Sequence, residues 1–214
     1  MTWFKVLAIS FVVLLLGMLF LGWLNGFPWE KQKAIENIKD YVKLNYDVTP
    51  TDIKVFLTNF QVSTGVVYSD ELPYCFEVFI KREDLSVYGD LYSDALIEYN
   101  LEKFIQKDIE DIKDVEVMVR LEGRLVGESV GLSVEEIKSN PEMIFQMPQI
   151  EYNCIVNIND FDCEKAYSVF KVITKKLQPT NISFRFFKKD GYVVVSNDEF
   201  EGIHNYDYFK RLIG

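Results

Sequence analysis

The sequence predicts an α+β protein in which an N-terminal transmembrane helix is followed by two small helix-on-antiparallel-sheet domains. Three observations lead to this fold class. One long apolar run stands near the N-terminus, helical and strand-like periodicities alternate after it, and 49% of the 214 residues are hydrophobic, which suffices for buried cores. We expect an anchor over residues 1–26, a first α+β domain over 27–113 and a second over 114–214.

The apolar run extends from Val6 to Leu24 and contains no charged residue. About 20 apolar residues, at ~1.5 Å rise per residue, cross the ~30 Å hydrocarbon core of a bilayer, so the run predicts a transmembrane helix. The three tryptophans, Trp3, Trp23 and Trp29, lie around its two ends. Because indole rings favour the headgroup level, we expect all three to be membrane-interface residues.

A cleaved signal peptide and a core helix of a soluble protein are the alternatives for this run. A signal peptide has an apolar core of about 7–15 residues and a small-x-small cleavage site, whereas this run is longer and leads into Asn25 and Gly26. The flanking basic residues Lys5, Lys31 and Lys33 are too evenly placed to decide orientation. A short N-terminal stub before one span is typical of a signal anchor, so we expect an extracytoplasmic C-terminal region at the cell membrane.

The first domain is predicted to have the order α-β-β-β-α. Pro28 suits the first turn of a helix, and an apolar stripe of period 3.6 continues that helix to residue 46. A polar break is expected at 63–65, a turn at Gly89-Asp90, and a second helix over about 93–112. The expected strands are 53–57, 66–68 and 74–80.

The second domain is predicted to begin with the alternating strand Val115 to Leu121. Ser133 and Glu136 form a capping box for a short helix, and Asp160 is expected to cap a longer helix that ends near Leu177. Asp190-Gly191 predicts a type I′ hairpin. The remaining expected elements are strands over 150–158, 182–187 and 192–195 and a terminal helix over 206–213.

Two segments are distinctive: the turn from Asn25 to Trp29 that leads into a Lys-rich helix, and PYCFEVFIKR, from Pro73 to Arg82. In these segments the chain resembles the YfjL-like family, which comprises small membrane-associated proteins of Gram-positive bacteria with two α+β domains. The resemblance implies a membrane location and the two-domain fold. It implies no site residues, and the lipid-attached cysteine common in the family has no counterpart after this span.

Composition excludes several classes of function. The chain has 23 basic and 33 acidic residues, a formal net charge of −10, which disfavours binding to nucleic-acid phosphates. One histidine and three cysteines are too few for a Cys/His zinc site with any redundancy. The acidic clusters do not follow the calcium-loop pattern. We therefore expect no cofactor, no metal and no nucleic-acid partner.

One segment, Gly127 to Gly131, has the G-x-S-x-G pattern of serine hydrolases. Ser129, an aspartate such as Asp160 or Asp198, and His204 even follow in the order that those enzymes use. The preceding strand ends near residue 121, however, so Ser129 is expected in a loop and not on a sharp elbow. A hydrolase using Ser129 and His204 is the alternative to the non-enzymatic reading, and we assign no catalytic residue.

Cysteines and C-terminal aromatic residues complete the predictions. Cys154 and Cys163 are close enough in the predicted fold for a disulfide, but buried free thiols are the preferred reading. Tyr206 and Tyr208 are candidates for an interaction surface, because aromatic residues with polar tips are common at interfaces. The sequence thus predicts a single-pass membrane-anchored protein with an acidic extracytoplasmic region and a binding or assembly role toward an unknown protein partner.

Overall fold

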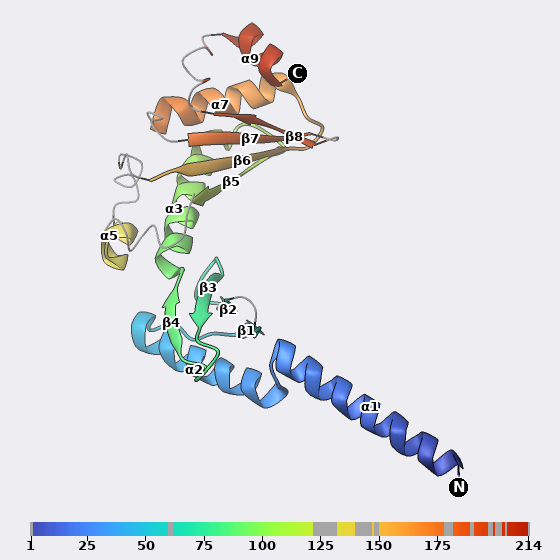
Figure 1. The fold of residues 1–214 in the computed structure, drawn as a ribbon. Helices are drawn as coiled ribbons and strands as arrows, with labels where there is room; N and C mark the ends of the chain where they lie inside the picture. The colour runs from blue at the N-terminus through green and yellow to red at the C-terminus, as the bar shows by residue number, and fades with distance from the viewer. Residues whose placement is uncertain are drawn as a thin grey trace. The chain divides into compact units, whose positions relative to one another are not determined.

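A computed structural model describes residues 2–59, 62–121, 132–139, 147, 150–177, 182–188, 191–196, 199, 203 and 205–213 (Figure 1). The fold is α+β, with a long apolar N-terminal helix and two four-stranded sheets with helices, which confirms the predicted fold class. The chain divides into two compact units, Met1–Tyr92 and Ser93–Gly214.

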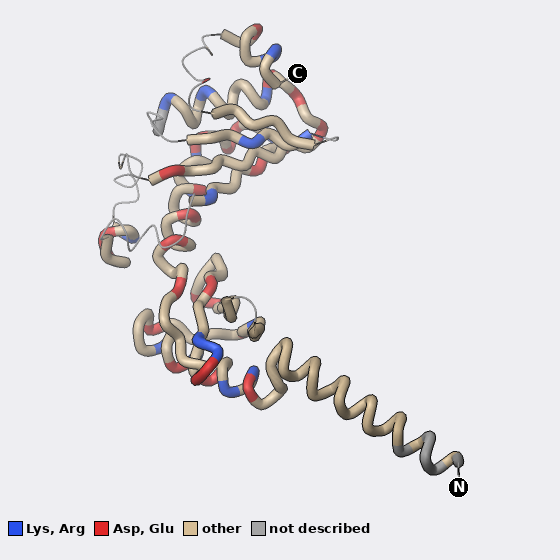
Figure 2. Tube along the Cα trace, viewed as in Figure 1, with Lys and Arg blue, Asp and Glu red and all other residues tan. Residues whose placement is uncertain are grey.

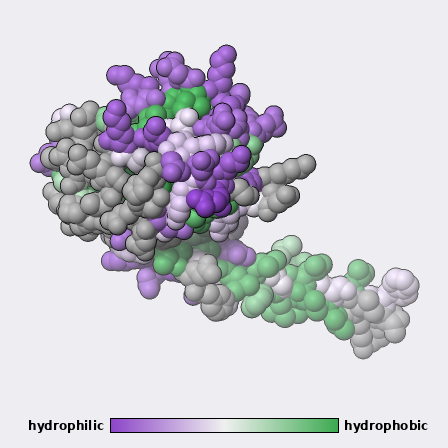
Figure 3. All heavy atoms as spheres, turned by 90° about the horizontal axis from the view of Figure 1, so that it is seen from above, coloured by the Kyte–Doolittle hydropathy of each residue, from purple (hydrophilic) through white to green (hydrophobic). Residues whose placement is uncertain are grey.

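Helix α1, Thr2–Asn25, contains the whole apolar run. Within the described part of the chain it is the one helix long and apolar enough to cross a membrane, a test that a signal sequence would also pass. Its side chains are largely exposed, for example Leu14 at 63% and Phe11 at 67%. Figure 3 shows an apolar surface along most of the helix, and Figure 2 shows no charged residue along its tan part; Lys5 precedes the apolar run.

The first sheet has the strand order β1-β2-β3-β4, and every neighbouring pair is antiparallel. Helix α2 packs on it through Ala34, Ile38 and Val42, which are fully buried. A Cβ on Gly65 would lie 2.5 Å from Cδ1 of Ile38, so this glycine permits the close approach of α2 to β2. The bounds of these elements are α2 Pro28–Tyr46, β1 Asp52–Phe56, β2 Ser63–Tyr68, β3 Phe76–Ile80 and β4 Val87–Asp90.

Two expectations for the first sheet are wrong. Residues 63–65, expected as a polar break, form the start of β2, because Ser63 is buried and its hydroxyl donates to the Thr58 carbonyl. Gly89 and Asp90, expected as a turn, lie in the missed strand β4. Asp90 is held there by tertiary contacts that its local sequence does not show.

Those contacts form a buried polar cluster around Asp90, which is 7% exposed. Its Oδ2 accepts hydrogen bonds from the hydroxyls of Tyr41 and Tyr46, each at 2.6 Å, and its Oδ1 accepts the Tyr92 backbone N–H at 2.8 Å. Burial, together with the neighbouring carboxylate, raises the pKa of Tyr46. The cluster therefore fastens the C-terminal end of α2 to β4.

The second sheet has the order β5-β6-β7-β8. It departs from a purely antiparallel sheet at one pair, since β6 and β7 are parallel. Helix α7 connects these two strands, and parallel neighbours require such a crossover. The elements are α3 Tyr92–Ile109, β5 Val115–Leu121, α5 Val134–Ser139, β6 Tyr152–Ile158, α7 Cys163–Leu177, β7 Ile182–Lys188, β8 Gly191–Val195 and α9 Tyr206–Ile213.

The boundary between the units follows Tyr92, whereas the sequence analysis placed a boundary after residue 113. The difference is α3, whose carboxylates bind the edge strand β5. Glu98 accepts the backbone N–H of Leu121 at 2.9 Å, and Glu102 accepts that of Val119 at 3.0 Å. Burial raises the pKa of Glu98, with the Leu121 N–H acting against this effect. Helix α3 thus covers part of a sheet edge in the second unit.

Helix starts in the second unit follow their capping side chains. The predicted capping box is present, since Ser133 N–H donates to Glu136 at 2.8 Å and Glu136 N–H donates to the Ser133 hydroxyl at 3.3 Å. Asp162, not Asp160, caps α7, because its Oδ1 accepts the Glu164 N–H at 2.7 Å. Asp160 lies in the preceding bend with a φ of 51°.

Candidate functional site

The strongest candidate site lies where α1 joins the first folded unit. The sequence predicted interface tryptophans here and at the start of the helix. Trp3, Trp23 and Trp29 are 82%, 50% and 66% exposed. Trp3 and Trp23 stand twenty residues apart on one continuous helix, roughly 30 Å at the α-helical rise. Their separation therefore matches the thickness of a hydrocarbon core, while their membrane contact remains a prediction.

The chain turns between α1 and α2 at Gly26, where φ is +79°. A Cβ at this position would also lie 2.7 Å from Cδ1 of Leu57, so the turn needs glycine for both conformation and space. A Cβ on Gly22 would meet the Phe27 ring at 2.2 Å. The last turn of α1 is therefore packed against two residues of the folded unit, Phe27 and the buried Leu57.

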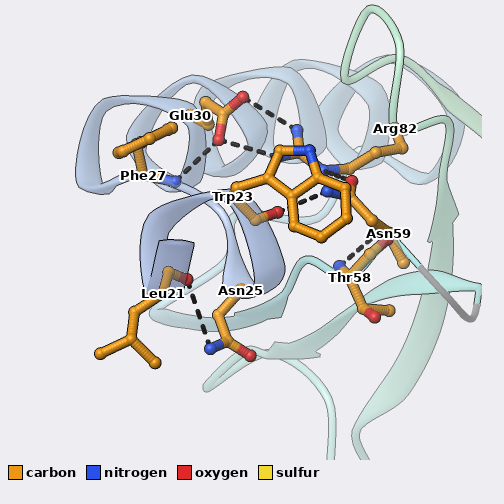
Figure 4. Close-up of polar contacts among 9 residues, drawn as sticks. Leu21, Trp23, Asn25, Phe27, Glu30, Thr58, Asn59 and Arg82 are labelled. Atoms are coloured by element: carbon orange, nitrogen blue, oxygen red, sulfur yellow. Dashed lines mark hydrogen bonds and ion pairs between the residues drawn. The ribbon is translucent and has the colours of Figure 1, made fainter. Parts of the chain in front are cut away.

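A polar network fixes the same turn (Figure 4). Both terminal nitrogens of Arg82 donate to the carboxylate of Glu30, each at 2.9 Å, in a bidentate pair. The Nε of Arg82 donates to the Asn59 side-chain oxygen at 3.1 Å, and the Asn59 amide donates to the Trp23 carbonyl. Glu30 also accepts the Phe27 backbone N–H at 2.7 Å. This network connects α1, α2, the β1–β2 connection and the end of β3.

Two effects of opposite sign act on the pKa of Glu30 at the junction. The hydrogen bond from Arg82 lowers the pKa of Glu30, and burial opposes this effect. The two side chains are 22% and 24% exposed, so the ion pair is mostly withdrawn from solvent. An open pocket of about 480 Å³ lies beside it, lined by Trp23, Asn59, Arg82 and Glu83. The arrangement positions the helix end and offers a mixed polar and aromatic surface next to it.

Catalytic geometry cannot be built from the described residues. Ser129, His204 and Asp198 of the alternative hydrolase set lie outside them, whereas Asp160, the other aspartate considered for that set, lies in the bend before α7. Among the described residues, no group of three or more His, Cys, Asp or Glu side chains is placed to hold a metal ion.

The cysteines, all within the described part, are free thiols: Cys75 is exposed, Cys163 half-buried and Cys154 buried. Burial raises the pKa of Cys154 to about 12, so this thiol stays protonated and unreactive at neutral pH.

The C-terminal candidates Tyr206 and Tyr208 lie on α9 and differ in their surroundings. Tyr206 is half-buried, with its ring 5.5 Å from that of Tyr167. Tyr208 is 38% exposed, and the Arg211 guanidinium lies 5.7 Å from its ring. Their neighbour Phe209 is fully buried against Phe170 and Phe186. Of the two candidates, Tyr208 presents the more accessible surface.

Sequence reasoning missed Arg82 and Asn59. Glu30 could have been noticed as the third helical residue after Phe27, a position where a carboxylate reaches back to the cap N–H. Arg82 is 52 residues from Glu30 and carries no local signal of that pairing. No family model, curated protein or solved structure matches the chain.

Proposed function

We propose that this chain is a single-pass membrane protein that retains α1 as its anchor and holds an acidic α+β region at the outer face of the membrane. Its role there is non-enzymatic binding or assembly with a protein partner. The resemblance of Asn25–Trp29 and Pro73–Arg82 to the YfjL-like family of Gram-positive bacteria is part of this proposal and favours the same location.

One observation carries the proposal: the end of α1 is part of the folded unit. Asn59 binds the Trp23 carbonyl, Leu57 fills the space beside Gly26, and the Phe27 ring covers Gly22. Cleavage after the apolar run would remove these contacts, which a disposable signal sequence has no reason to make. The same helix exposes its apolar side chains over the rest of its length, as a lipid-facing helix does.

The charge of the region after α1 favours a basic partner. Residues 25–214 hold all 33 acidic groups and, with Lys5 excluded, 22 of the 23 basic groups, a balance of −11. Anionic headgroups would repel such a surface, whereas basic loops of a membrane complex would complement it. Anchoring raises the local concentration of the region at the membrane, so a weak contact through an exposed residue such as Tyr208 suffices for assembly.

Retention of the anchor is tested by mass spectrometry of the membrane fraction. We expect the intact N-terminus, and a mature chain that begins between Gly22 and Glu30 would overturn the proposal. Leu15→Arg should cost roughly 2.5–3.5 kcal/mol of insertion free energy and reduce membrane yield. Leu44→Arg is the matched control, because Leu44 is 85% exposed outside α1 and the same change there should leave the yield unaltered.

Topology and chemistry are tested with two reagents. A membrane-impermeant maleimide should label the exposed Cys75 on intact cells, and Cys75→Ser should abolish this signal. Labelling only after permeabilisation would place the region in the cytoplasm.

The hydrolase alternative is tested with a fluorophosphonate probe, which should not label the full-length protein in detergent. Labelling lost in Ser129→Ala would replace the binding role with the hydrolase alternative.

A further inference from the structure

Three large apolar side chains stand exposed around the end of α1. They are Trp29 on α2 at 66%, Phe56 at the end of β1 at 58%, and Val62 just before β2 at 53%. We call these three residues the collar. They come from three separate segments of the first unit, so their exposure is not a property of one helix face or one strand.

Two of the collar residues are linked to residues 22–26 through one neighbour each. Trp29 stacks on Phe27 at 4.5 Å between ring centroids, and the Phe27 ring lies over Gly22. Phe56 directly precedes Leu57, which contacts Gly26.

Val62 is connected to α1 through the β1–β2 connection. It precedes Ser63, whose hydroxyl is bonded to the backbone of Thr58, and the next residue, Asn59, binds the Trp23 carbonyl. Figure 1 shows β1 beside the C-terminal end of α1. The segments that carry the three side chains therefore lie near residues 22–26, at the end of α1.

We infer that the collar inserts into the lipid headgroup region, so that the first unit is seated on the bilayer and does not hang from a free tether. This inference rests on the proposed function, because it takes the bilayer level from α1. The lipid surface is the occupant that the geometry selects, since the segments that carry the collar contact residues 22–26, where the exposed apolar surface of α1 ends. Tryptophan, the largest collar side chain, favours that depth.

The charges of the junction are partly paired. Arg82 and Glu30 neutralise each other through their bidentate pair, whereas the exposed Glu83 also lines the pocket beside Trp23. Zwitterionic lipid is therefore the appropriate partner, and anionic lipid is not required.

Exposure alone does not define the collar. Leu44 is more exposed still, but it lies fifteen residues beyond Trp29 on α2, roughly 22 Å farther along the helix.

The test measures depth with a fluorophore at single cysteines. In full-length protein carrying Cys75→Ser and Cys163→Ser, the probe is attached at Phe56→Cys, Val62→Cys, Leu14→Cys or Leu44→Cys. Each sample is reconstituted into phosphatidylcholine vesicles with and without a lipid that carries a nitroxide near its headgroup. We expect blue-shifted emission and nitroxide quenching at positions 56 and 62. At position 14, which lies in the middle of the span and far from the headgroup nitroxide, we expect a blue shift with weaker quenching, and at 44 neither effect.

The control positions separate the two levels of the argument. Emission at Leu14→Cys without a blue shift would refute the membrane anchor itself. A blue-shifted probe at Leu14→Cys, with probes at 56 and 62 behaving like that at 44, would refute the seating alone. Equal quenching at 44 would show unspecific adsorption and also refute the collar. A blue shift at 56 and 62 that grows with protein concentration without quenching would identify a second copy of the chain as the occupant.

Discussion

The ion pair between Arg82 and Glu30 should contribute measurably to the stability of the first unit. An exposed ion pair contributes about 0.2–1 kcal/mol, and breaking a fully buried pair costs about 3–5 kcal/mol. Here the side chains are 22% and 24% exposed, and the two bonds are 2.9 Å each. We expect Arg82→Gln to destabilise the unit by about 2 kcal/mol, because it leaves the Glu30 carboxylate half-buried without its partner.

The contribution of the pair itself is isolated by a double-mutant cycle with Glu30→Gln. Hydrogen exchange followed by mass spectrometry, on the full chain in detergent micelles, reports the opening of each unit separately. A loss of about 2 kcal/mol corresponds to roughly 30-fold faster exchange of the protected amides of α2 and β3, given 1.36 kcal/mol per factor of ten. The coupling energy in the cycle should be about 1.5 kcal/mol.

A matched pair in the second unit provides the control. Arg120 lies 2.9 Å from Glu102, but its side chain is 47% exposed, so its coupling energy should stay below about 1 kcal/mol. If the coupling of Arg82 with Glu30 were no larger than that of this exposed pair, the reasoning from burial would be refuted.

The same pair predicts a pH dependence. Because Arg82 lowers the pKa of Glu30 in the folded state, the stabilisation is fully present above the ordinary glutamate pKa of 4.5. It is lost as the pH falls through the lower folded-state pKa. Arg82→Gln should therefore weaken the acid dependence of exchange in α2, and an unchanged acid profile would show that other carboxylates cause it.

Three further predictions concern single positions. Gly26→Ala should destabilise the first unit by about 1–3 kcal/mol in the same exchange measurement, because φ is +79° and the new Cβ would meet Leu57. Gly17→Ala is the control and should leave the stability unchanged, because no atom lies within 4 Å of the new Cβ. Because the pKa of Tyr46 is raised, the stability of the first unit should fall as the pH rises above about 10, where an unfolded tyrosine ionises, and Tyr46→Phe should reduce that fall in a thermal melt. Phe209→Ala should destabilise the second unit by about 3–5 kcal/mol, because this side chain is fully buried. Tyr208→Ala should leave the melting temperature nearly unchanged and weaken co-purification with the partner. A large loss of melting temperature with Tyr208→Ala would show that this residue belongs to the core.

Much of the fold could be predicted because its signals are local. Pro28 and the 3.6-residue apolar stripe predicted α2 with both of its ends, and strict alternation predicted β5. The uninterrupted run from Val6 to Leu24 predicted α1. In each case the residues that form the element also carry the pattern that identifies it.

The missed features depend on partners distant in sequence. Gly89 and Asp90 form a turn in most contexts, but Asp90 is held in β4 by tyrosines 44 and 49 residues away. Helix α3 was predicted as the last element of the first domain. Two of its glutamates bind backbone amides of β5 that lie 17 and 23 residues farther along the chain.

The features of the candidate site also fall into these two groups, those with a local signal and those that depend on distant partners. The tryptophans around α1 were candidates because of their spacing around the apolar run, and their interface role stays a prediction, whereas Arg82 is joined to Glu30 across 52 residues. No periodicity or turn preference encodes such a pairing, because it depends on how β3 and α2 meet in the folded unit.

The carboxylates of α3 on strand β5 limit how copies of this chain can associate through the second sheet. With two amides of β5 already occupied by Glu98 and Glu102, addition of a foreign strand to the second sheet is directed to its opposite end, β8. Two β8 strands that paired with each other would occupy both available ends, and such a symmetric contact closes on itself. The edge chemistry of this sheet therefore favours discrete pairs over open-ended filaments.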